Sequence, residues 1–198
     1  MAKRVFDLVG AALALGLLWP LLVGIALWIK LDSPGPVLFR QQRVGRHGRV
    51  FSIRKFRTMA ADAPEHGPLI TVGNDPRITR AGGWLRRSKL DELPQLIDVL
   101  AGHMSLVGPR PEVPAYVARY PRDLRDKVLA VRPGITDPVS LAMADEGALL
   151  AAATDPEREY IEVLLPRKLH AAAAYAERAT LWTDLGVIAR TLRLLARR

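Results

Sequence analysis

The stretch LVGAALALGLLWPLLVGIALWI, from Leu8 to Ile29, has 22 residues and no charged side chain. A helix of this length and composition can cross the apolar interior of a bilayer. A cleaved signal peptide is the weaker alternative, because the run is long, has no clear small-residue cleavage site, and continues to Lys30. The stretch therefore predicts that residues 1–30 form a helix that enters a membrane.

Pro20 lies near the middle of this stretch, where a proline removes a helical hydrogen bond and bends the helix. Both flanks are basic, with Lys3 and Arg4 before the stretch and Lys30 after it. Cytoplasmic flanks carry the excess of lysine and arginine, so basic residues at both ends favour two ends on the cytoplasmic side. We predict a re-entrant helix that breaks at Pro20. A spanning helix kinked by this proline is the alternative.

The net charge indicates an anionic partner. The 198 residues include 29 Lys and Arg against 20 Asp and Glu, which gives +9. Residues 1–57 hold ten basic and two acidic side chains, or 10 − 2 = +8 of this charge. Nucleic acid, a lipid surface and phosphorylated small molecules would all suit such a distribution. Aromatic side chains are not interleaved with the basic ones as base stacking requires, so no nucleic acid is expected.

The remaining residues, 31–198, are predicted to form one catalytic domain of the α+β class that is mostly helical. Apolar residues on both sides of the turn Gly45–Gly48 predict a short β-hairpin at residues 37–53. Apolar side chains with helical spacing predict an amphipathic helix at residues 93–100. The chain contains no cysteine, which excludes disulfides, thiolate catalysis and cysteine-ligated metals.

The last helical segment, residues 181–195, has one apolar stripe with arginines beside it. The stripe consists of Leu181, Leu185, Ile188, Leu192 and Leu195. Such a pattern is typical of an amphipathic helix that lies at a membrane surface. The alternative is a helix that packs its stripe in the core and ends in arginines that suit its dipole.

Two neighbouring acids, Asp91 and Glu92, lie in KLDELPQL at the expected start of the helix at residues 93–100. In a first helical turn both can face one point and lie near free backbone N–H groups. Two ionised acids this close repel unless cations stand between them, and oxygen ligands suit Mg²⁺. We predict a catalytic Mg²⁺ site here. The alternative is a pair of acids that only complements the helix dipole, with Ser88 and Asp91 at capping-box spacing.

Basic residues near these acids favour the catalytic Mg²⁺ site over a role as helix-dipole complement. Lys55 and Arg57 close the hairpin, Arg86 precedes the acids, and Arg110 lies between two prolines. Arginine makes bidentate contacts to phosphate oxygens, and lysine supplies a compact charge. Together with Mg²⁺, these four residues predict a site that binds a diphosphate.

Four motifs occur in order behind the apolar stretch: KFRTM (55–59), LDELPQL (90–96), MSLVGPRPE (104–112) and RPGIT (132–136). This set resembles the bacterial sugar transferase family, in the form of the small monotopic phosphoglycosyl transferases. The resemblance covers about residues 3–136. It implies a monotopic enzyme with a re-entrant helix on the cytoplasmic face of the bacterial inner membrane, in contact with its phospholipids.

The resemblance also implies a reaction. A sugar-1-phosphate would move from a UDP-sugar to a polyprenol phosphate such as undecaprenyl phosphate, with release of UMP, as the first membrane step of glycoconjugate assembly. It implies Mg²⁺ as cofactor and an Asp-Glu dyad, matched by Asp91 and Glu92, whose aspartate is the nucleophile. Lys55, Arg86 and Arg110 match basic positions near the phosphates.

This chain departs from the family pattern at several points. Trp19 takes the place of a frequent serine before the break proline, and His103 takes the place of a frequent acid. Residues 137–140 diverge after RPGIT, so the sugar is not predicted, and neither is the oligomeric state. Two other functions stay open: a membrane-associated Mg²⁺-dependent nucleotide-sugar diphosphatase, and a non-enzymatic basic protein that binds a membrane surface.

Overall fold

The computed structural model describes residues 1–63, 75–139 and 146–196. The helices are α1 (Ala2–Asp32), α2 (Arg80–Ser88), α3 (Gln95–Leu100), α4 (Pro114–Val117), α5 (Arg122–Leu129), α7 (Glu146–Ala152), α8 (Pro156–Glu159), α9 (Leu165–Arg178) and α10 (Leu181–Ala196). The strands are β1 (Leu38–Val44), β2 (Val50–Phe56), β3 (Ser105–Val107) and β4 (Gly134–Thr136). The prediction of a mostly helical α+β fold is confirmed.

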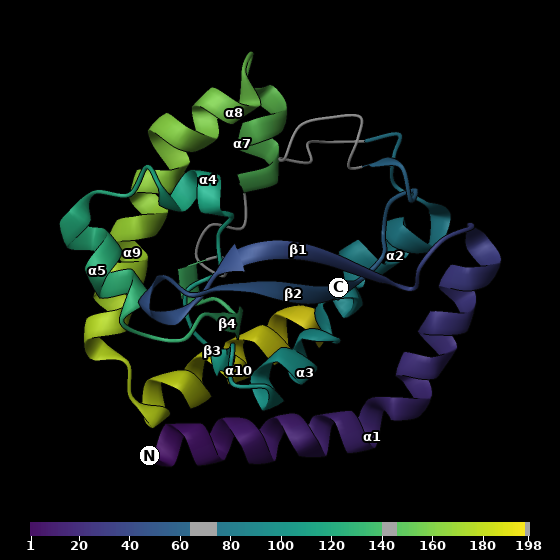
Figure 1. Ribbon diagram of the computed structural model, residues 1–198, viewed down its shortest axis with the longest axis horizontal. Helices are drawn as coiled ribbons and strands as arrows, with labels where there is room; N and C mark the ends of the chain where they lie inside the picture. Colours follow the sequence, from purple (N-terminus) through teal and green to yellow (C-terminus); the bar gives the residue numbers. More distant parts are fainter. Residues whose placement is uncertain (64–74, 140–145, 197–198) are drawn as a thin grey trace.

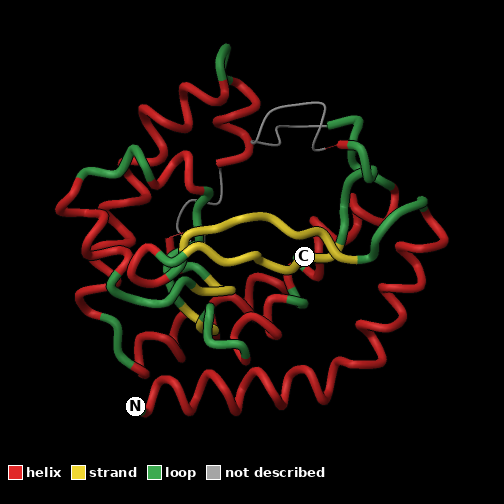
Figure 2. Tube along the Cα trace, viewed as in Figure 1, coloured by secondary structure: helices red, strands yellow, loops and turns green. Residues whose placement is uncertain are grey.

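The predicted hairpin is present and slightly longer than expected. β1 and β2 pair antiparallel, from Leu38 opposite Phe56 to Val44 opposite Val50. Their turn contains His47 at φ 58° and Gly48 at φ 75°. Figure 2 shows this hairpin running across the middle of the molecule, with helices around it. The hairpin therefore forms the scaffold on which the flanking helices pack.

A second, smaller sheet is present that the sequence patterns do not predict. β3 and β4 pair parallel, with Ser105 opposite Gly134 and Val107 opposite Thr136. The backbones cross closely here, because a Cβ on Gly134 would lie 2.0 Å from the nitrogen of Gly108. Strands of three residues are too short to show an alternating pattern, which is why the sequence does not predict them.

Helix α1 continues through Pro20 without interruption, and Figure 1 shows that it bends part-way along its length. The predicted break is therefore a bend in one helix, for which the proline is the expected cause. α1 is long and apolar enough to cross a membrane, and only a small share of its apolar window is buried in the protein. Most of its large apolar side chains are therefore available to lipid.

Both limbs of α1 pack on the same folded domain. Ala11, in the first limb, belongs to a core that also contains Phe51, Ile53, Leu96, Val99 and Met104. Ile25 and Ile29, in the second limb, pack with Phe56 and Leu85. The ends are also held by polar contacts: Arg4 donates to the Val99 carbonyl over 2.8 Å, and Asp32 accepts from the Ala81 amide over 3.1 Å.

Helix α10 lies against β3 and β4, and its residues Asp184 and Val187 are buried. Leu185 and Leu192, from the predicted apolar stripe, are exposed, and so is Trp182. The alternative of a stripe packed in the core is therefore wrong. The remaining core lies between α5 and α9, with Tyr116 and Tyr160 in contact at 5.1 Å between ring centroids.

Candidate active site

Asp91 and Glu92 lie in a 3₁₀ turn, Leu90–Glu92, between α2 and α3. Lys89 has a left-handed backbone, φ 60°, that ends α2 and begins this turn. The regular helix α3 begins only at Gln95. The acids thus precede the helix rather than start it, and their side chains are not constrained by helical spacing.

The predicted capping box is wrong. The Ser88 hydroxyl donates to the carbonyls of Trp84 and Leu85 at the end of α2, over 3.0 and 3.2 Å. Ser88 therefore belongs to the preceding helix, and the Asp91 carboxylate is not a helix cap.

Glu92 is held by two cations. Lys55 Nζ and Arg110 Nη2 both donate to its Oε1, over 2.8 and 2.7 Å. Burial alone would raise the pKa of Glu92, but the charges of Arg110 and then Lys55 hold it far below its usual value. Glu92 in turn raises the pKa of Arg110, while burial and the Arg110 charge lower the pKa of Lys55. Glu92 is therefore ionised and fixes both cations beside Asp91.

Asp91 has the opposite surroundings. Its side chain is 9% exposed, and its Oδ1 is buried with no hydrogen-bond partner within the described residues. Burial, and then the charge of Glu92, raise the pKa of Asp91. A buried carboxylate oxygen without a partner is costly, so its presence indicates a ligand or a reacting group.

A cavity of about 450 Å³ opens over these two acids. All six predicted catalytic and binding residues line it: Lys55, Arg57, Arg86, Asp91, Glu92 and Arg110. Arg43, Arg77 and Lys89 add further positive charge, and Phe39, Met59 and Ala60 add apolar surface. The volume suits a small-molecule ligand, and the cationic lining favours one with phosphate groups.

Arg86 reaches the cavity from α2. Its Nε donates to the Thr58 hydroxyl over 2.9 Å, and burial lowers its pKa. The helix approaches the Thr58 backbone so closely that a Cβ on Gly82 would lie 2.0 Å from the Thr58 carbonyl oxygen. Gly82 and Thr58 together thus determine where the Arg86 guanidinium lies.

Arg57 differs from the prediction. Although it lines the cavity, its guanidinium donates to the backbone carbonyls that follow α1, at Pro34 and, over 2.7 Å, at Ser33. It also donates to the Ser33 hydroxyl over 3.0 Å. The side chain is 4% exposed. Arg57 therefore anchors the end of α1, and the prediction that it grips phosphate does not fit these contacts.

The sequence analysis missed Gln41 and Arg43, which also face the cavity from β1. Arg43 Nη2 donates to Gln41 Oε1 over 2.6 Å, and Nη1 donates to the Pro111 carbonyl over 3.0 Å. The signal was the period of two along the strand, which places Phe39, Gln41 and Arg43 on one face. Arg43 thus links the hairpin to the loop that carries Arg110.

The donors present fit Mg²⁺ in a limited way. No group of three or more His, Cys, Asp or Glu side chains comes together in the part of the chain that the structure describes. Asp91 and Glu92 supply two carboxylates, and the unpartnered Asp91 Oδ1 is a suitable hard ligand. Mg²⁺ typically takes one or two carboxylates and completes its shell with water and substrate phosphate. These two residues therefore suit the ion only together with a phosphorylated substrate.

Comparison with known proteins identifies the family of this chain. The model of a family described as bacterial sugar transferase matches residues 1–198. The chain belongs to this family. The match includes the residues after Thr136, beyond the motifs that first indicated the resemblance. The bacterial sugar transferase family thus accounts for the whole chain, including α1 and α10.

Several curated relatives are named for a transfer reaction. A UDP-N-acetylgalactosamine-undecaprenyl-phosphate N-acetylgalactosaminephosphotransferase of Aeromonas hydrophila is 38% identical over 98% of this chain and 43% of that protein. A UDP-glucose:undecaprenyl-phosphate glucose-1-phosphate transferase of Xanthomonas campestris pv. campestris is 47% identical over 69% of this chain and 29% of that protein. A protein of the same name from Caulobacter vibrioides is 40% identical over 97% of this chain and 68% of that protein. The chain therefore spans less than half of the first two relatives.

Proposed function

We propose that this chain transfers a sugar-1-phosphate from a UDP-sugar to polyprenol phosphate, of the undecaprenyl type, and releases UMP. The observation that carries the proposal is the buried, unpartnered Asp91 Oδ1 beside a Glu92 that holds two cations. The names of the relatives agree on the acceptor and differ in the sugar, which is N-acetylgalactosamine or glucose. The proposal therefore specifies the donor class and leaves the sugar to experiment.

In the first step the UDP-sugar diphosphate enters the cavity, where Arg86, Arg110 and Lys55 supply positive charge. The Asp91 carboxylate attacks the phosphorus that carries the sugar, forming an O–P bond. The bond from that phosphorus to the bridging oxygen breaks, and its electron pair leaves with UMP. Asp91 then carries a covalent phospho-sugar, so the soluble donor can depart before the lipid acceptor arrives.

In the second step a phosphate oxygen of the polyprenol phosphate attacks the same phosphorus. The bond to Asp91 breaks, and its electron pair restores the carboxylate. The product is a polyprenol-diphosphate sugar. The raised pKa of Asp91 fits the first step, because a more basic carboxylate is a better nucleophile, and the burial of this side chain keeps water away from the intermediate.

Mg²⁺ held by Asp91 and Glu92 would supply Lewis-acid stabilisation of the negative charge on the diphosphate. Glu92 contributes in its own right, since it keeps Lys55 and Arg110 in place beside the nucleophile. The two carboxylates thus divide the work: Asp91 reacts, and Glu92 organises the charges around it.

The membrane placement follows from α1 and the tryptophans. Both limbs of α1 pack on one domain, which supports a re-entrant helix with both ends on the cytoplasmic face of the inner membrane. All four tryptophans of the chain, Trp19, Trp28, Trp84 and Trp182, are exposed, and they lie on α1, α2 and α10. Tryptophan is enriched where membranes meet water, so these three helices would contact phospholipid.

The test is a two-part assay of the full chain in detergent or bilayer discs. A panel of UDP-sugars that includes UDP-N-acetylgalactosamine and UDP-glucose is incubated with Mg²⁺ and undecaprenyl phosphate, and UMP is measured. Without acceptor, intact-protein mass spectrometry should show a phospho-sugar adduct on the wild type and none on Asp91→Asn. Free sugar phosphate formed without acceptor would instead identify a diphosphatase. A fully active Asp91→Asn protein would exclude the covalent mechanism.

A further inference from the structure

Helix α10 buries the carboxylate of Asp184 and leaves several large apolar side chains exposed. Asp184 is 0% exposed and Val187 is buried beside it, whereas Trp182 is 82% exposed and Leu192 is also exposed. A fully buried carboxylate is costly unless it is paired and hydrogen-bonded. The contacts of Asp184 therefore decide how α10 is held.

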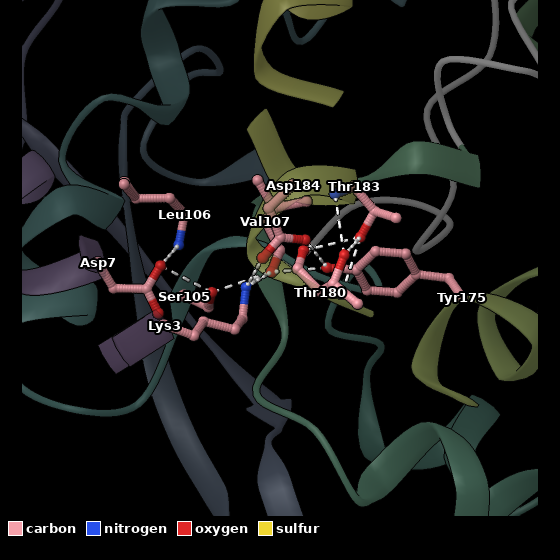
Figure 3. A network of polar contacts seen from close by, with 9 residues as sticks. All are labelled: Lys3, Asp7, Ser105, Leu106, Val107, Tyr175, Thr180, Thr183 and Asp184. Atoms are coloured by element: carbon pink, nitrogen blue, oxygen red, sulfur yellow. Dashed lines mark hydrogen bonds and ion pairs between the residues drawn. The ribbon is translucent and has the colours of Figure 1, made fainter. Parts of the chain in front are cut away.

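Asp184 joins three helices (Figure 3). Lys3 of α1 forms an ion pair with its Oδ2, and the Tyr175 hydroxyl of α9 donates to its Oδ1 over 2.5 Å. Lys3 and Asp184 are thus partners at opposite ends of the chain. The carboxylate has a donor on each oxygen, which is the arrangement that makes its burial tolerable.

Lys3 also binds the end of β3, because its Nζ donates to the Val107 carbonyl over 3.1 Å as well as pairing with Asp184. The Ser105 hydroxyl donates to the same carbonyl over 2.9 Å. The Tyr175 hydroxyl lies 3.3 Å from it, but its single proton is directed to Asp184 Oδ1. Figure 3 shows Lys3 and Tyr175 approaching this region from different helices. Asp184 therefore orients the Lys3 ammonium onto the Val107 carbonyl.

The backbone from Val107 leads directly to Arg110 and has little freedom. The Gly108 amide donates to the Thr136 carbonyl over 3.1 Å, and a Cβ on Gly108 would lie 2.4 Å from the Arg132 carbonyl oxygen. Pro109 follows with a fixed φ. A shift of the Val107 carbonyl would therefore be passed to Arg110, whose Nη2 lies 2.7 Å from Glu92 Oε1.

We propose that Asp184 is a positioning residue for Arg110. Its carboxylate, which accepts from the Tyr175 hydroxyl, holds the Lys3 ammonium on the Val107 carbonyl, and this fixes the segment that places Arg110 on Glu92. The inference rests on the proposed transferase function, in which Arg110 acts on the diphosphate. It assigns a role in the reaction to α10, a helix that contributes no residue to the lining of the cavity.

The first test is a double-mutant cycle on UMP release with Asp184→Asn and Arg110→Lys. Asparagine keeps the shape of the side chain and loses the charge that pairs with Lys3. Residues that act through one another give non-additive losses, so Asp184→Asn should lower kcat/KM about tenfold in the wild type and less than about twofold in Arg110→Lys. Equal fold losses in both backgrounds would show that Asp184 acts only on stability, and would overturn the proposal.

Val187→Ala is the matched control, because Val187 is buried on the same helix and its side chain has no polar group. It loosens the packing of α10 and leaves the Asp184 network intact. The fold loss in kcat/KM caused by Val187→Ala should multiply with the fold loss caused by Arg110→Lys, as expected for two independent effects. If Val187→Ala shows the same non-additivity as Asp184→Asn, the network has no specific role.

The second test does not depend on activity. Hydrogen exchange of the peptide covering residues 104–112 should be faster in Asp184→Asn than in the wild type and unchanged in Val187→Ala. If Asp184→Asn does not fold, Tyr175→Phe removes one donor from the Asp184 carboxylate that holds Lys3 and should show the same local effect. Unchanged exchange in the folded variant would refute the proposal, whereas a wild type that releases no UMP would refute only the proposed function.

Discussion

Asp91 and Glu92 are adjacent in the chain, yet their carboxylates have opposite surroundings: Glu92 Oε1 accepts from two cations, and Asp91 Oδ1 is buried with no hydrogen-bond partner within the described residues. The difference arises because Lys55 and Arg110 converge on one residue of the pair. As a result one acid has its charge compensated, and the other is left reactive. The predictions below depend on this division.

Asp91→Asn should make the protein more stable at neutral pH, although it removes activity. Burial raises the pKa of Asp91 in the folded protein, so ionisation of this group costs stability. Its favourable contribution is present below the unfolded pKa and is lost as the pH rises through the folded pKa. Thermal unfolding at pH 7 should therefore give a higher Tm for Asp91→Asn, and the difference should shrink on acidification. A lower Tm at pH 7 would contradict this.

Formation of the covalent adduct should depend on pH through Asp91. The rate should rise with pH along an acid limb whose midpoint lies above the value of an ordinary aspartate, because burial and Glu92 both raise this pKa. Glu92→Gln removes the neighbouring negative charge and should move the limb to lower pH. It should also lower the rate about 100-fold, since breaking a buried ion pair costs roughly 3 kcal/mol. Glu92→Asp, which keeps the charge, is the control. An unmoved limb would show that another group titrates.

Arg57→Lys and Arg110→Lys should have different effects. Arg57 donates to carbonyls at the end of α1, so its loss should lower stability by about 2–3 kcal/mol, with KM for the UDP-sugar within about twofold of wild type. Arg110→Lys keeps the charge without the planar fork and should lower kcat/KM strongly. Chemical denaturation measures the stability of both variants, and steady-state kinetics measure their kcat/KM and KM. A large rise in KM for Arg57→Lys would restore the role in phosphate binding.

The neighbouring glycines Gly82 and Gly83 offer a matched pair of tests. Alanine at either position gains about 1 kcal/mol of helix propensity. A Cβ on Gly82 would lie 2.0 Å from the Thr58 carbonyl oxygen, whereas the nearest atom to a Cβ on Gly83 is 3.6 Å away. Gly83→Ala should thus be neutral or stabilising. Gly82→Ala should cost about 2 kcal/mol or more and, because it displaces Arg86, should also reduce UMP release. Equal Tm values for Gly82→Ala and Gly83→Ala would show that α2 can move away from the Thr58 backbone at no cost in stability.

Single cysteines can test the topology of α1, since the chain has none of its own. Ala2 and Pro34 are exposed near the two ends of the helix. A membrane-impermeant thiol reagent should label Ala2→Cys and Pro34→Cys from the cytoplasmic side in inverted vesicles, and neither in intact cells. Leu17→Cys should stay unlabelled until detergent is added. Labelling of the two ends from opposite faces would establish a spanning helix.

Local patterns were enough to predict several parts of this molecule. The hairpin followed from strand alternation around a turn, and the cavity residues Lys55, Arg86, Asp91, Glu92 and Arg110 followed from chemistry and motif order. These features depend on short segments in which the structure or the chemistry requires particular residue types. The sequence therefore predicted which side chains line the cavity, but not that Lys55 and Arg110 both bind Glu92.

The parts that were missed depend on contacts between distant segments. The role of Arg57 is set by carbonyls more than twenty positions earlier, and Lys3 pairs with Asp184 near the other end of the chain. Lys3 and Arg4 were interpreted as topology signals, yet both also bond to the folded domain. Sequence periodicity does not indicate these long-range partners, because each of the basic residues alone resembles an ordinary surface cation.

Since α1 supplies Ala11, Ile25 and Ile29 to two hydrophobic cores, it is part of the folded domain and cannot be removed without exposing them. Deleting it to obtain a water-soluble enzyme would uncover Phe56, Leu85 and Val99, and the remainder should aggregate.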